Sequence, residues 1–561
     1  MERRFLLAVS LMIAVLVVPS LLLKRPARPV TSRADSAAVQ AAQHPAPAGD
    51  SSAVRRPSSI GSAPSGAPAG SSDSAASSGE DTVALALPDA IYRFSARGGT
   101  MDRAVIPSIR DLHHKEPRQP VQLVRADDRL LARRIVVGAD TLRLDNVPFS
   151  LASQADGIEM IGRLGSLTET VRMRPVPGHP YLLDVTGEFN GLEGRGALLV
   201  IGLGNGLANV EADSMDNYRN YAVTVRRGSP ENTNFRSVNE GATQTLAGPF
   251  DWVGVKSKYF LGAVLSADSA KPQFGGALLL GRPREGRLAT TLQTLVTMPV
   301  GPDGRYHYQF YMGPQTFRTL RAMGRDMDRA SSYGWIFKPI VMPAAAIITR
   351  LFMWMHANLH LSYGLVLIVF GVLVRLVLWP LNQKAMKSQV AMMAIQPVLK
   401  DIQTRYKNDP QKLQQEMMKT YKEHNVNPLG GCLPMLIPMP VLLALFFVFN
   451  RALELRGTPF LWIPDLSLRD PLFITPIVMG LSMFGLSKLS QAGMPPNPQT
   501  KMMTTVMPVM MTFLFLNFAS GLNLYYAVSN LVSLPQQFII NKSRAAEMAR
   551  RQVSVSSKTG G

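Results

Sequence analysis

Five apolar segments follow one another in the C-terminal part of the chain, after Ser331. They cover residues 361–381, 429–450, 472–489, 502–518 and 521–540. A bilayer core about 30 Å thick is crossed by roughly 20 helical residues. Because lipid offers no hydrogen-bond partner, each segment has to satisfy its own backbone polar groups, which a helix does. The pattern predicts a polytopic α-helical membrane protein and argues against a soluble cytoplasmic enzyme.

A further apolar run near the N-terminus covers residues 5–23, directly after Arg3 and Arg4. A cleavable signal peptide begins in the same way, but no small-x-small cleavage site follows this run. We therefore predict an uncleaved transmembrane anchor over residues 1–25, which makes six spans in all. A cleaved signal peptide is the alternative.

The region between the anchor and the apolar segments divides into two parts. Residues 26–82 are mostly Ser, Ala, Pro and Gly and have too little apolar surface to offset the entropy of ordering, which predicts a flexible linker. Residues 83–330 carry short alternating runs between Gly and Asn turns, without a helical pattern. In one run Tyr306, Tyr308 and Phe310 share a face, the period of a half-buried strand. This part predicts a large antiparallel β-sandwich.

Residues 331–360 are apolar but are interrupted by Pro339, Pro343 and Arg350, which predicts an amphipathic helix lying in the membrane interface. With six spans, the N-terminus, the Lys-rich loop 384–427 and the basic tail 542–561 share one side of the membrane. The positive-inside rule assigns that side to the cytoplasm, so the β-sandwich is periplasmic. Membrane proteins acquire basic charge through such cytoplasmic loops, so the net charge of +20 does not require nucleic acid, and no direct nucleic-acid substrate is expected.

Arg375 is a charged residue within the apolar segment 361–381. A charge at mid-span costs about 2.5–3.5 kcal/mol on insertion scales. The six spans contain no Asp or Glu that could pair with it. Two interpretations remain: the side chain extends to the cytoplasmic interface, or it faces a hydrated cavity open to the cytoplasm. The missing acids also weaken the hypothesis of a proton- or sodium-coupled transporter.

The last two spans add polar side chains suited to such a cavity. Ordinary helix packing explains hydroxyl and amide groups equally well. The residues are Asn517, Ser520, Asn523, Ser529, Asn530, Ser533, Gln536 and Gln537.

The loop 384–427 predicts a cytoplasmic helical hairpin. Asp409 and Pro410 suit the N-cap and first position of its second helix. Its apolar side chains could form a flexible capture surface, because methionine repacks around varied partners, or simply the hairpin core. The residues concerned are Met386, Met393, Met417 and Tyr421.

Signs of catalysis are missing from the sequence. It contains no CxxC, HExxH, Walker or GxSxG motif, and no spacing singles out a carboxylate pair. Its one cysteine, Cys432, excludes an internal disulfide and a cysteine-rich metal site. We expect no catalytic residue, no metal and no cofactor.

Several local patterns together resemble one family, the YidC membrane-protein insertases of Gram-negative bacteria, within the YidC/Oxa/Alb superfamily. In the apolar part they are Val374-Arg375 with Trp379-Pro380-Leu381, Asn-Pro-Leu-Gly-Gly-Cys at 427–432, Leu-Trp-Ile-Pro-Asp-Leu at 461–466, and Gly-Leu-Asn-Leu-Tyr-Tyr-Ala-Val-Ser-Asn at 521–530 with Gln536-Gln537. In the β-rich part they are 94–99, 252–260 and 311–314.

The resemblance implies a five-helix insertase core, residues 361–541, with a hydrophilic groove closed outward and open to the cytoplasm and lipid. Arg375 would be its charge, and Met439, Leu442, Tyr525 and Tyr526 match positions that meet substrate. One departure is Pro438, where close relatives have a polar residue. The full expected groove set is Arg375, Met439, Leu442, Asn517, Ser520, Tyr525, Tyr526, Asn530 and Gln536.

The implied function is insertion and folding of inner-membrane proteins, without enzymatic chemistry. The implied partners are nascent membrane proteins, the lipid bilayer, the Sec translocon (SecYEG and SecDF) and the ribosome with the signal recognition particle pathway. Two other functions stay open on the sequence. A polytopic transporter would need a through-pathway, and a cell-envelope carbohydrate-binding or carbohydrate-modifying protein would place its function in the β-sandwich.

Overall fold

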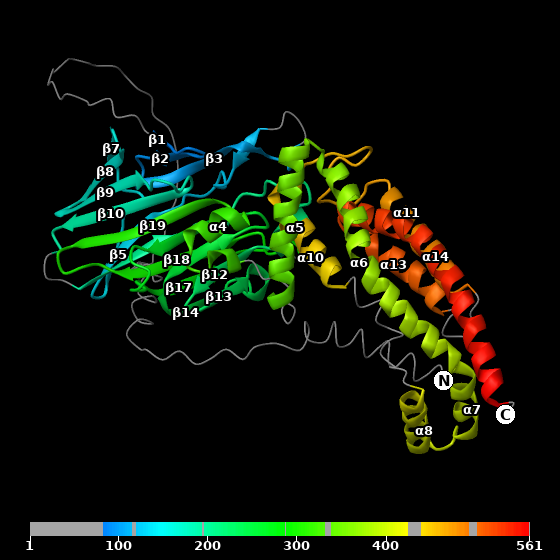
Figure 1. The fold of residues 1–561 in the computed structure, drawn as a ribbon. Helices are drawn as coiled ribbons and strands as arrows, with labels where there is room; N and C mark the ends of the chain where they lie inside the picture. Colours follow the sequence, from blue (N-terminus) through cyan, green and yellow to red (C-terminus); the bar gives the residue numbers. More distant parts are fainter. Residues whose placement is uncertain are drawn as a thin grey trace, which may run out of the picture.

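The chain folds into a β-rich part and a helical part that lie side by side (Figure 1). The computed structural model describes residues 82–114, 119–192, 196–286, 288–330, 338–424, 439–492 and 502–559. The expected anchor 1–25, nearly all of the linker 26–82, Cys432 and Pro438 lie outside the described residues.

The β-rich part contains a nine-stranded and a six-stranded antiparallel sheet. The first has the order β13-β12-β15-β16-β19-β10-β9-β8-β7 and the second the order β14-β17-β18-β11-β5-β6. The strands of the first are β7 (Phe149–Gln154), β8 (Gly157–Leu164), β9 (Leu167–Pro175), β10 (Leu182–Asn190), β12 (Ala222–Arg226), β13 (Pro230–Asn234), β15 (Trp252–Lys256), β16 (Phe260–Ser266) and β19 (Arg305–Pro314). Those of the second are β5 (Ala132–Val137), β6 (Asp140–Arg143), β11 (Ala197–Gly202), β14 (Thr243–Phe250), β17 (Phe274–Gly281) and β18 (Leu292–Pro299).

A smaller four-stranded sheet precedes these two in the chain. Its strands are β1 (Thr82–Ala86), β2 (Ile91–Ser95), β3 (Thr100–Arg110) and β4 (Pro120–Gln122), paired in that order.

The two large sheets share one hydrophobic core, so the expected antiparallel β-sandwich is confirmed. Residues of both sheets belong to this core, among them Leu199 of β11 and Val264 of β16. Along β19 the expected alternation also holds: Tyr306, Tyr308 and Phe310 are buried, while the residues before each of the two tyrosines are exposed.

The sandwich also contains two short α-helices that the sequence pattern did not predict. They are α3 (Ser214–Arg219) and α4 (Phe317–Met323), and their N-caps are Asp213 and Thr316. A helix of two turns or fewer is too short to show a 3.6-residue period. The N-capping side chains were the only signal in the sequence.

An ion pair lies inside the sandwich core and bridges its two sheets. Arg133 of β5 donates from Nε to Glu169 of β9 at 2.8 Å, and both side chains are fully buried. Tyr306 of β19 donates its hydroxyl to the same carboxylate at 2.6 Å. Arg133 also donates to the carbonyls of Gly98, Gly99 and Leu131. These bonds compensate much of the cost of removing two charges from water.

Replacing Glu169 should test this arrangement. Glu169→Ala leaves the Arg133 charge buried without its partner, and we expect a loss of about 3–5 kcal/mol in unfolding free energy. Denaturant unfolding of the full chain, followed by near-UV circular dichroism, measures the loss. The control is Glu159→Ala, which breaks the part-exposed pair with Arg172 and should cost less than about 1 kcal/mol. Equal losses for the two variants would contradict a structural role for the buried pair.

The helical part contains long helices and several short ones. They are α5 (Lys338–Leu359), α6 (Tyr363–Ala394), α7 (Gln396–Arg405), α8 (Pro410–Glu423), α10 (Met439–Arg451), α11 (Ile474–Ser490), α13 (Met507–Phe515) and α14 (Ser520–Thr559). A π-helical turn, Met502–Val506, precedes α13, and a 3-10 turn, Leu453–Leu455, follows α10. Two further 3-10 turns, Phe235–Ser237 and Met327–Arg329, belong to the β-rich part.

The five expected spans after residue 360 each contain a described helix, but the helix lengths differ from those of the apolar segments. Among the described helices one, Tyr363–Gln383, is long and apolar enough to cross a membrane by length and composition. Helix α6 continues beyond the expected span into the loop 384–427 and ends at Ala394, just before α7 begins. Helix α14 likewise runs without interruption from the last span into the tail. The count of six spans stays a prediction.

Helix α5 has two different faces. One face is buried against the helical part and packs on α10. The other face exposes Ile347 and Trp354. The buried side chains are Val341, Ala345, Ile348, Phe352 and Met355, spaced three and four residues apart as on one side of a helix.

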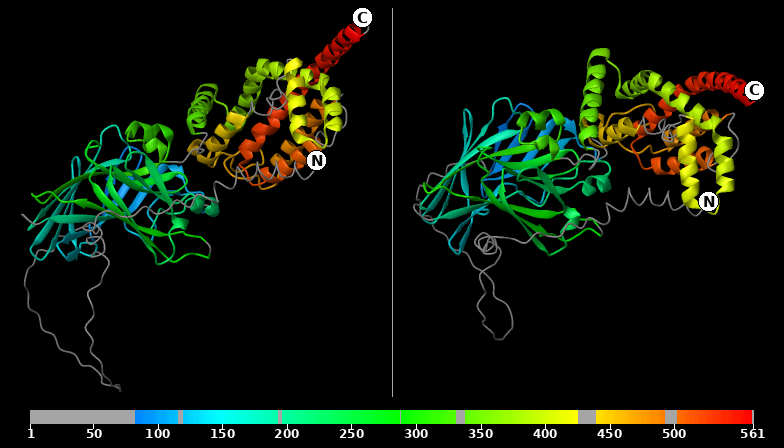
Figure 2. Two further views of the ribbon diagram at one scale, coloured as in Figure 1. Left: turned by 90° about the horizontal axis from the view of Figure 1, so that it is seen from below. Right: turned by 60° about the horizontal axis from the view of Figure 1, so that its bottom comes forward.

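The predicted hairpin forms from α7 and α8. Asp409 caps α8 by accepting a hydrogen bond from the backbone N–H of Lys412, with Pro410 at the first helical position, as expected. In both views of Figure 2 the hairpin lies at the end of the helical part away from the sandwich.

Candidate functional site

Arg375 lies on α6, facing α14. Its Nε donates a hydrogen bond to Oγ of Ser529 on α14 at 2.7 Å, and the side chain is half-buried. None of the carboxylates among the described residues forms an ion pair with it. A hydroxyl therefore satisfies part of the guanidinium without neutralising its charge.

Aromatic side chains of α14 line the contact with α6 and α13. Tyr525 is buried and packs on Phe370 of α6, with ring centroids 5.8 Å apart. Tyr526 is half-buried and meets Phe515 of α13 edge to face at 5.3 Å. Both tyrosines lie about one helical turn before Ser529, the residue that Arg375 contacts.

A polar stripe continues along α14 beyond Ser529. Asn530 donates from Nδ2 to Oγ of Ser482 on α11 at 3.1 Å. Ser533 donates to the carbonyl of Ser529, and Gln536 is also buried. Ser482 was missed by sequence reasoning. Its only signal was a hydroxyl in the middle of an apolar segment, which is common in ordinary helix packing.

Asn517 and Ser520 belong to the other end of α14. Asn517 is exposed in the turn between α13 and α14. Ser520 is fully buried and donates to the carbonyl of Asp465 at 3.2 Å. Nine residues of helix, roughly 13 Å, separate Ser520 from Ser529. The structure does not bring these two residues to Arg375.

The remaining expected residues lie on α10 and in the hairpin. Leu442 is half-buried on α10, next to the core of the helical part. Met417 and Tyr421 pack against the buried Ile395 and Leu399, so these two side chains form the hairpin core. The side chains of Met386, Met393 and Met439 lie outside the described residues.

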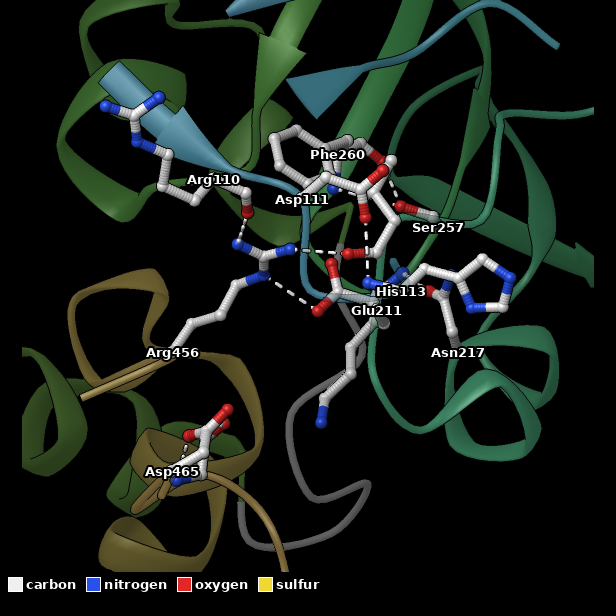
Figure 3. Close-up of polar contacts among 12 residues, drawn as sticks. Arg110, Asp111, His113, Glu211, Asn217, Ser257, Phe260, Arg456 and Asp465 are labelled. Atoms are coloured by element: carbon white, nitrogen blue, oxygen red, sulfur yellow. Dashed lines mark hydrogen bonds and ion pairs between the residues drawn. The ribbon is translucent and has the colours of Figure 1, made fainter. Parts of the chain in front are cut away.

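Arg456, which follows α10, joins the helical part to the sandwich (Figure 3). Its Nε donates to Oε2 of Glu211 at 2.7 Å, and its two terminal nitrogens donate to the carbonyls of Arg110 and Val210, each at 2.7 Å. Sequence reasoning missed Arg456 and Glu211, because they are 245 residues apart and neither lies in a motif.

This contact between Arg456 and Glu211 is almost inaccessible to solvent. The side chains of Arg456 and Glu211 are exposed by only 3% and 7%. Burial raises the pKa of the Glu211 carboxyl, and the positive charge of Arg456 opposes that shift. The Arg456 guanidinium also lies 6.0 Å from the ring centroids of Tyr259 and Phe260. Breaking this pair therefore leaves a buried charge in either domain.

Two family models match the chain in the two parts that the fold distinguishes. The model described as 60Kd inner membrane protein matches residues 354–547, and the model described as YidC periplasmic domain matches residues 205–355. The membrane protein insertase YidC of Chlorobaculum tepidum is 30% identical over 526 residues, which is 85% of each chain. The chain belongs to the YidC family of membrane protein insertases.

Other comparisons agree with this assignment. The YidC insertase of Geobacter metallireducens is 29% identical and covers 98% of this chain and 100% of its own. That of Anaeromyxobacter dehalogenans is 33% identical over 78% and 79% of the two chains. A solved structure of YidC from Thermotoga maritima is 15% identical, covers 81% of this chain and 99% of that chain, and has a TM-score of 0.27, too low to support a comparison of folds.

Membership of the YidC family places this chain in the inner membrane with its β-sandwich as a periplasmic domain. It acts on nascent membrane proteins in the bilayer as an insertase, not as an enzyme. In this insertase the Arg456 contact therefore joins the periplasmic domain to the membrane part.

Removing Arg456 should loosen that junction. In Arg456→Met, Glu211 stays buried without its partner and two carbonyls lose their donor, so we expect a cost of about 3–5 kcal/mol at the interface. Faster hydrogen exchange at the backbone amides around Val210 measures it. Arg305→Met is the control, because its pair with Glu188 is largely exposed. If Arg456→Met exchanges no faster than this control, the contact does not hold the two domains together.

Proposed function

We propose that this chain inserts membrane proteins through a hydrophilic groove between α6, α11 and α14, with Arg375 as its positive charge. The observation that carries the proposal is the half-buried Arg375, bonded to Ser529 and without an ion-pair partner among the described residues. An uncompensated cation is costly in hydrocarbon, and a hydrated groove removes much of that cost. The buried Asn530, Ser533 and Gln536 support a polar path along the same helix.

The physical basis of insertion is solvation. A polar segment that crosses a bilayer loses its hydrogen bonds with water, and this desolvation opposes translocation. A wet, cationic groove that reaches part-way across shortens the apolar distance and attracts acidic residues in the translocated tail. The apolar helix of the substrate then leaves sideways into lipid, driven by burial of its own surface. No nucleotide or covalent step is required.

The proposed groove is open to the cytoplasm and to lipid and closed toward the periplasm. Asn517 and Ser520 would lie at its closed outer end, since Ser520 is bonded to the loop carbonyl of Asp465. The residues that we propose for the rest of the groove are Arg375, Met439, Leu442, Tyr525, Tyr526, Asn530 and Gln536.

We further propose six spans, with both termini in the cytoplasm. The proposed divisions are 1–25 for the anchor, 26–82 for the linker, 83–330 for the periplasmic domain, 331–360 for the interfacial helix, 361–541 for the core and 542–561 for the tail. Support comes from Figure 1, where the hairpin and the C-terminal end of α14 lie at the end of the helical part remote from the sandwich.

The same orientation suits the proposed partners. The cytoplasmic hairpin, which includes Met386, Met393, Met417 and Tyr421, would receive chains delivered by the ribosome and the signal recognition particle pathway. The periplasmic domain would contact the Sec translocon (SecYEG and SecDF), with which the insertase acts in addition to acting alone.

Charge at position 375 is the first test. Arg375→Ala should slow insertion of a substrate with an acidic tail roughly tenfold, equivalent to about 1.4 kcal/mol, because attraction across a partly desolvated groove exceeds that in bulk water. The same substrate with a neutral tail should suffer less. Arg375→Lys should retain much of the activity, since lysine keeps the charge and loses only the planar donors. The measurement is reconstituted insertion at matched protein levels.

The control for this test is Arg469→Ala, which removes an exposed arginine in the loop before α11. It should leave both substrates unaffected. Equal defects for acidic and neutral tails in Arg375→Ala would contradict the electrostatic role and leave Arg375 a structural residue.

Topology is the second test. In a variant without Cys432, a single cysteine at Asn408, in the exposed turn of the hairpin, should be shielded from an impermeant thiol reagent added to the periplasmic side. A single cysteine at the exposed Ser237 of the sandwich should react. Labelling at position 408 from outside would refute the six-span arrangement and make 331–360 a further span.

A further inference from the structure

A cavity lies where the sandwich, the interfacial helix and the outer end of the membrane part meet. Its volume is about 400 Å³, within the range of sites for small ligands. One wall is α4 at the end of the sandwich, the second is α5, and the third is the C-terminal end of α10 with the turn that follows it. Figure 1 shows α5 standing between the sandwich and the rest of the helical part.

The walls of this cavity combine positively charged and apolar side chains. Arginines from both sides supply positive charge: Arg318 and Arg321 come from α4, and Arg350 comes from α5. Apolar residues of α5 and α10 form another part of the lining: Ala345, Ala346, Met353, Phe447 and Val448. A ligand that fits both surfaces has an anionic head and an apolar body.

The positive charge is not neutralised within the described part of the chain. None of its carboxylates forms an ion pair with Arg318, Arg321 or Arg350, and all three side chains are exposed. Glu454 is the one acid in the lining. Burial raises the pKa of the Glu454 carboxyl.

The position of the cavity selects the ligand. It adjoins the periplasmic domain on one side and the last turn of α10 on the other. In the topology proposed above, on which this inference rests, the headgroups of the outer leaflet meet the protein at that level. Helix α5 exposes Ile347 and Trp354 beside it, by 64% and 55%. Large apolar side chains and tryptophan at that depth are typical of residues that contact lipid.

We propose that this cavity binds the headgroup of an acidic phospholipid from the outer leaflet. The guanidinium groups of Arg318, Arg321 and Arg350 hold the phosphate, since their planar donors match its oxygens. The glycerol and upper acyl chains lie along Ala346, Met353 and Phe447. The bound lipid joins α4 of the periplasmic domain to α5 and α10, in a place separate from the groove around Arg375.

A titration of the purified full-length chain in a neutral detergent tests the proposal. The probes are short-chain phosphatidylglycerol, phosphatidylethanolamine and phosphatidylcholine, and inorganic phosphate. The readouts are the thermal unfolding midpoint and the lipids retained in native mass spectrometry. We expect phosphatidylglycerol to raise the midpoint and to be retained, and the other three probes to act at least tenfold more weakly.

Two kinds of variant separate charge from shape. Arg318→Gln, Arg321→Gln and Arg350→Gln should each weaken binding of phosphatidylglycerol about five-fold, the usual contribution of one basic residue near an anionic membrane surface. Ala346→Trp should abolish binding by filling the apolar side without changing any charge. The matched controls are Arg163→Gln, Arg219→Gln and Arg236→Gln, three exposed arginines of the sandwich outside the cavity, which should bind as the parent does.

Several results would overturn the proposal. Equal affinity for phosphatidylcholine would exclude charge recognition, and preference for phosphatidylethanolamine would exclude an acidic lipid. Inorganic phosphate that binds as tightly as phosphatidylglycerol would indicate a simple anion site. Unchanged lipid retention in the three cavity arginine variants, or the same loss in the three controls, would place the lipid elsewhere on the surface.

Discussion

The cost of placing charge and backbone polarity in lipid is the constraint on which the membrane part depends. Its described helices form their own backbone hydrogen bonds, and several of their polar side chains meet one another across helix contacts. Arg375 meets Ser529 at 2.7 Å, and Asn530 meets Ser482 at 3.1 Å, so α14 carries the polar groups that join it to α6 and α11. A helix that collects polar groups in this way suits the groove wall that we propose for polar segments of a substrate.

Arg456, at the other end of the helical part, is a second desolvated cation with a different role from Arg375. Arg375 has no carboxylate partner among the described residues, whereas Arg456 is bonded to Glu211 and to two backbone carbonyls. A buried arginine whose donors and charge all have partners acts as a structural connection, because removing either member of its ion pair leaves an unpaired charge. An arginine that lacks a carboxylate partner keeps a charge and donors that can interact with another molecule. Arginine thus joins two domains at position 456, and at position 375 we propose that it recognises substrate.

In the hairpin, two of the residues expected to meet substrate pack inside the hairpin instead. Met417 and Tyr421 lie on the stripe that the sequence indicated, and they contact Ile395 and Leu399 rather than solvent. A role of the hairpin in receiving substrate would then depend on its exposed side chains, such as Val398 and Met418, and on its place at the end of α6.

Much of this protein was determined by local sequence pattern. Alternation along β19, the cap at Asp409 and the spacing of buried residues on α5 follow from the period of each element and from which side chains avoid water. The resemblance around Arg375 and the 521–530 segment led to the right family. Pattern could not give the partners of Arg375 and Arg456, because Ser529 and Glu211 are 154 and 245 residues away. Nor could it give the Arg133–Glu169 pair inside the sandwich, or the meeting of α4, α5 and α10 around a cationic cavity. Those contacts join elements that are distant in the chain, and only the packing of the sheets and helices decides which polar groups lose water together.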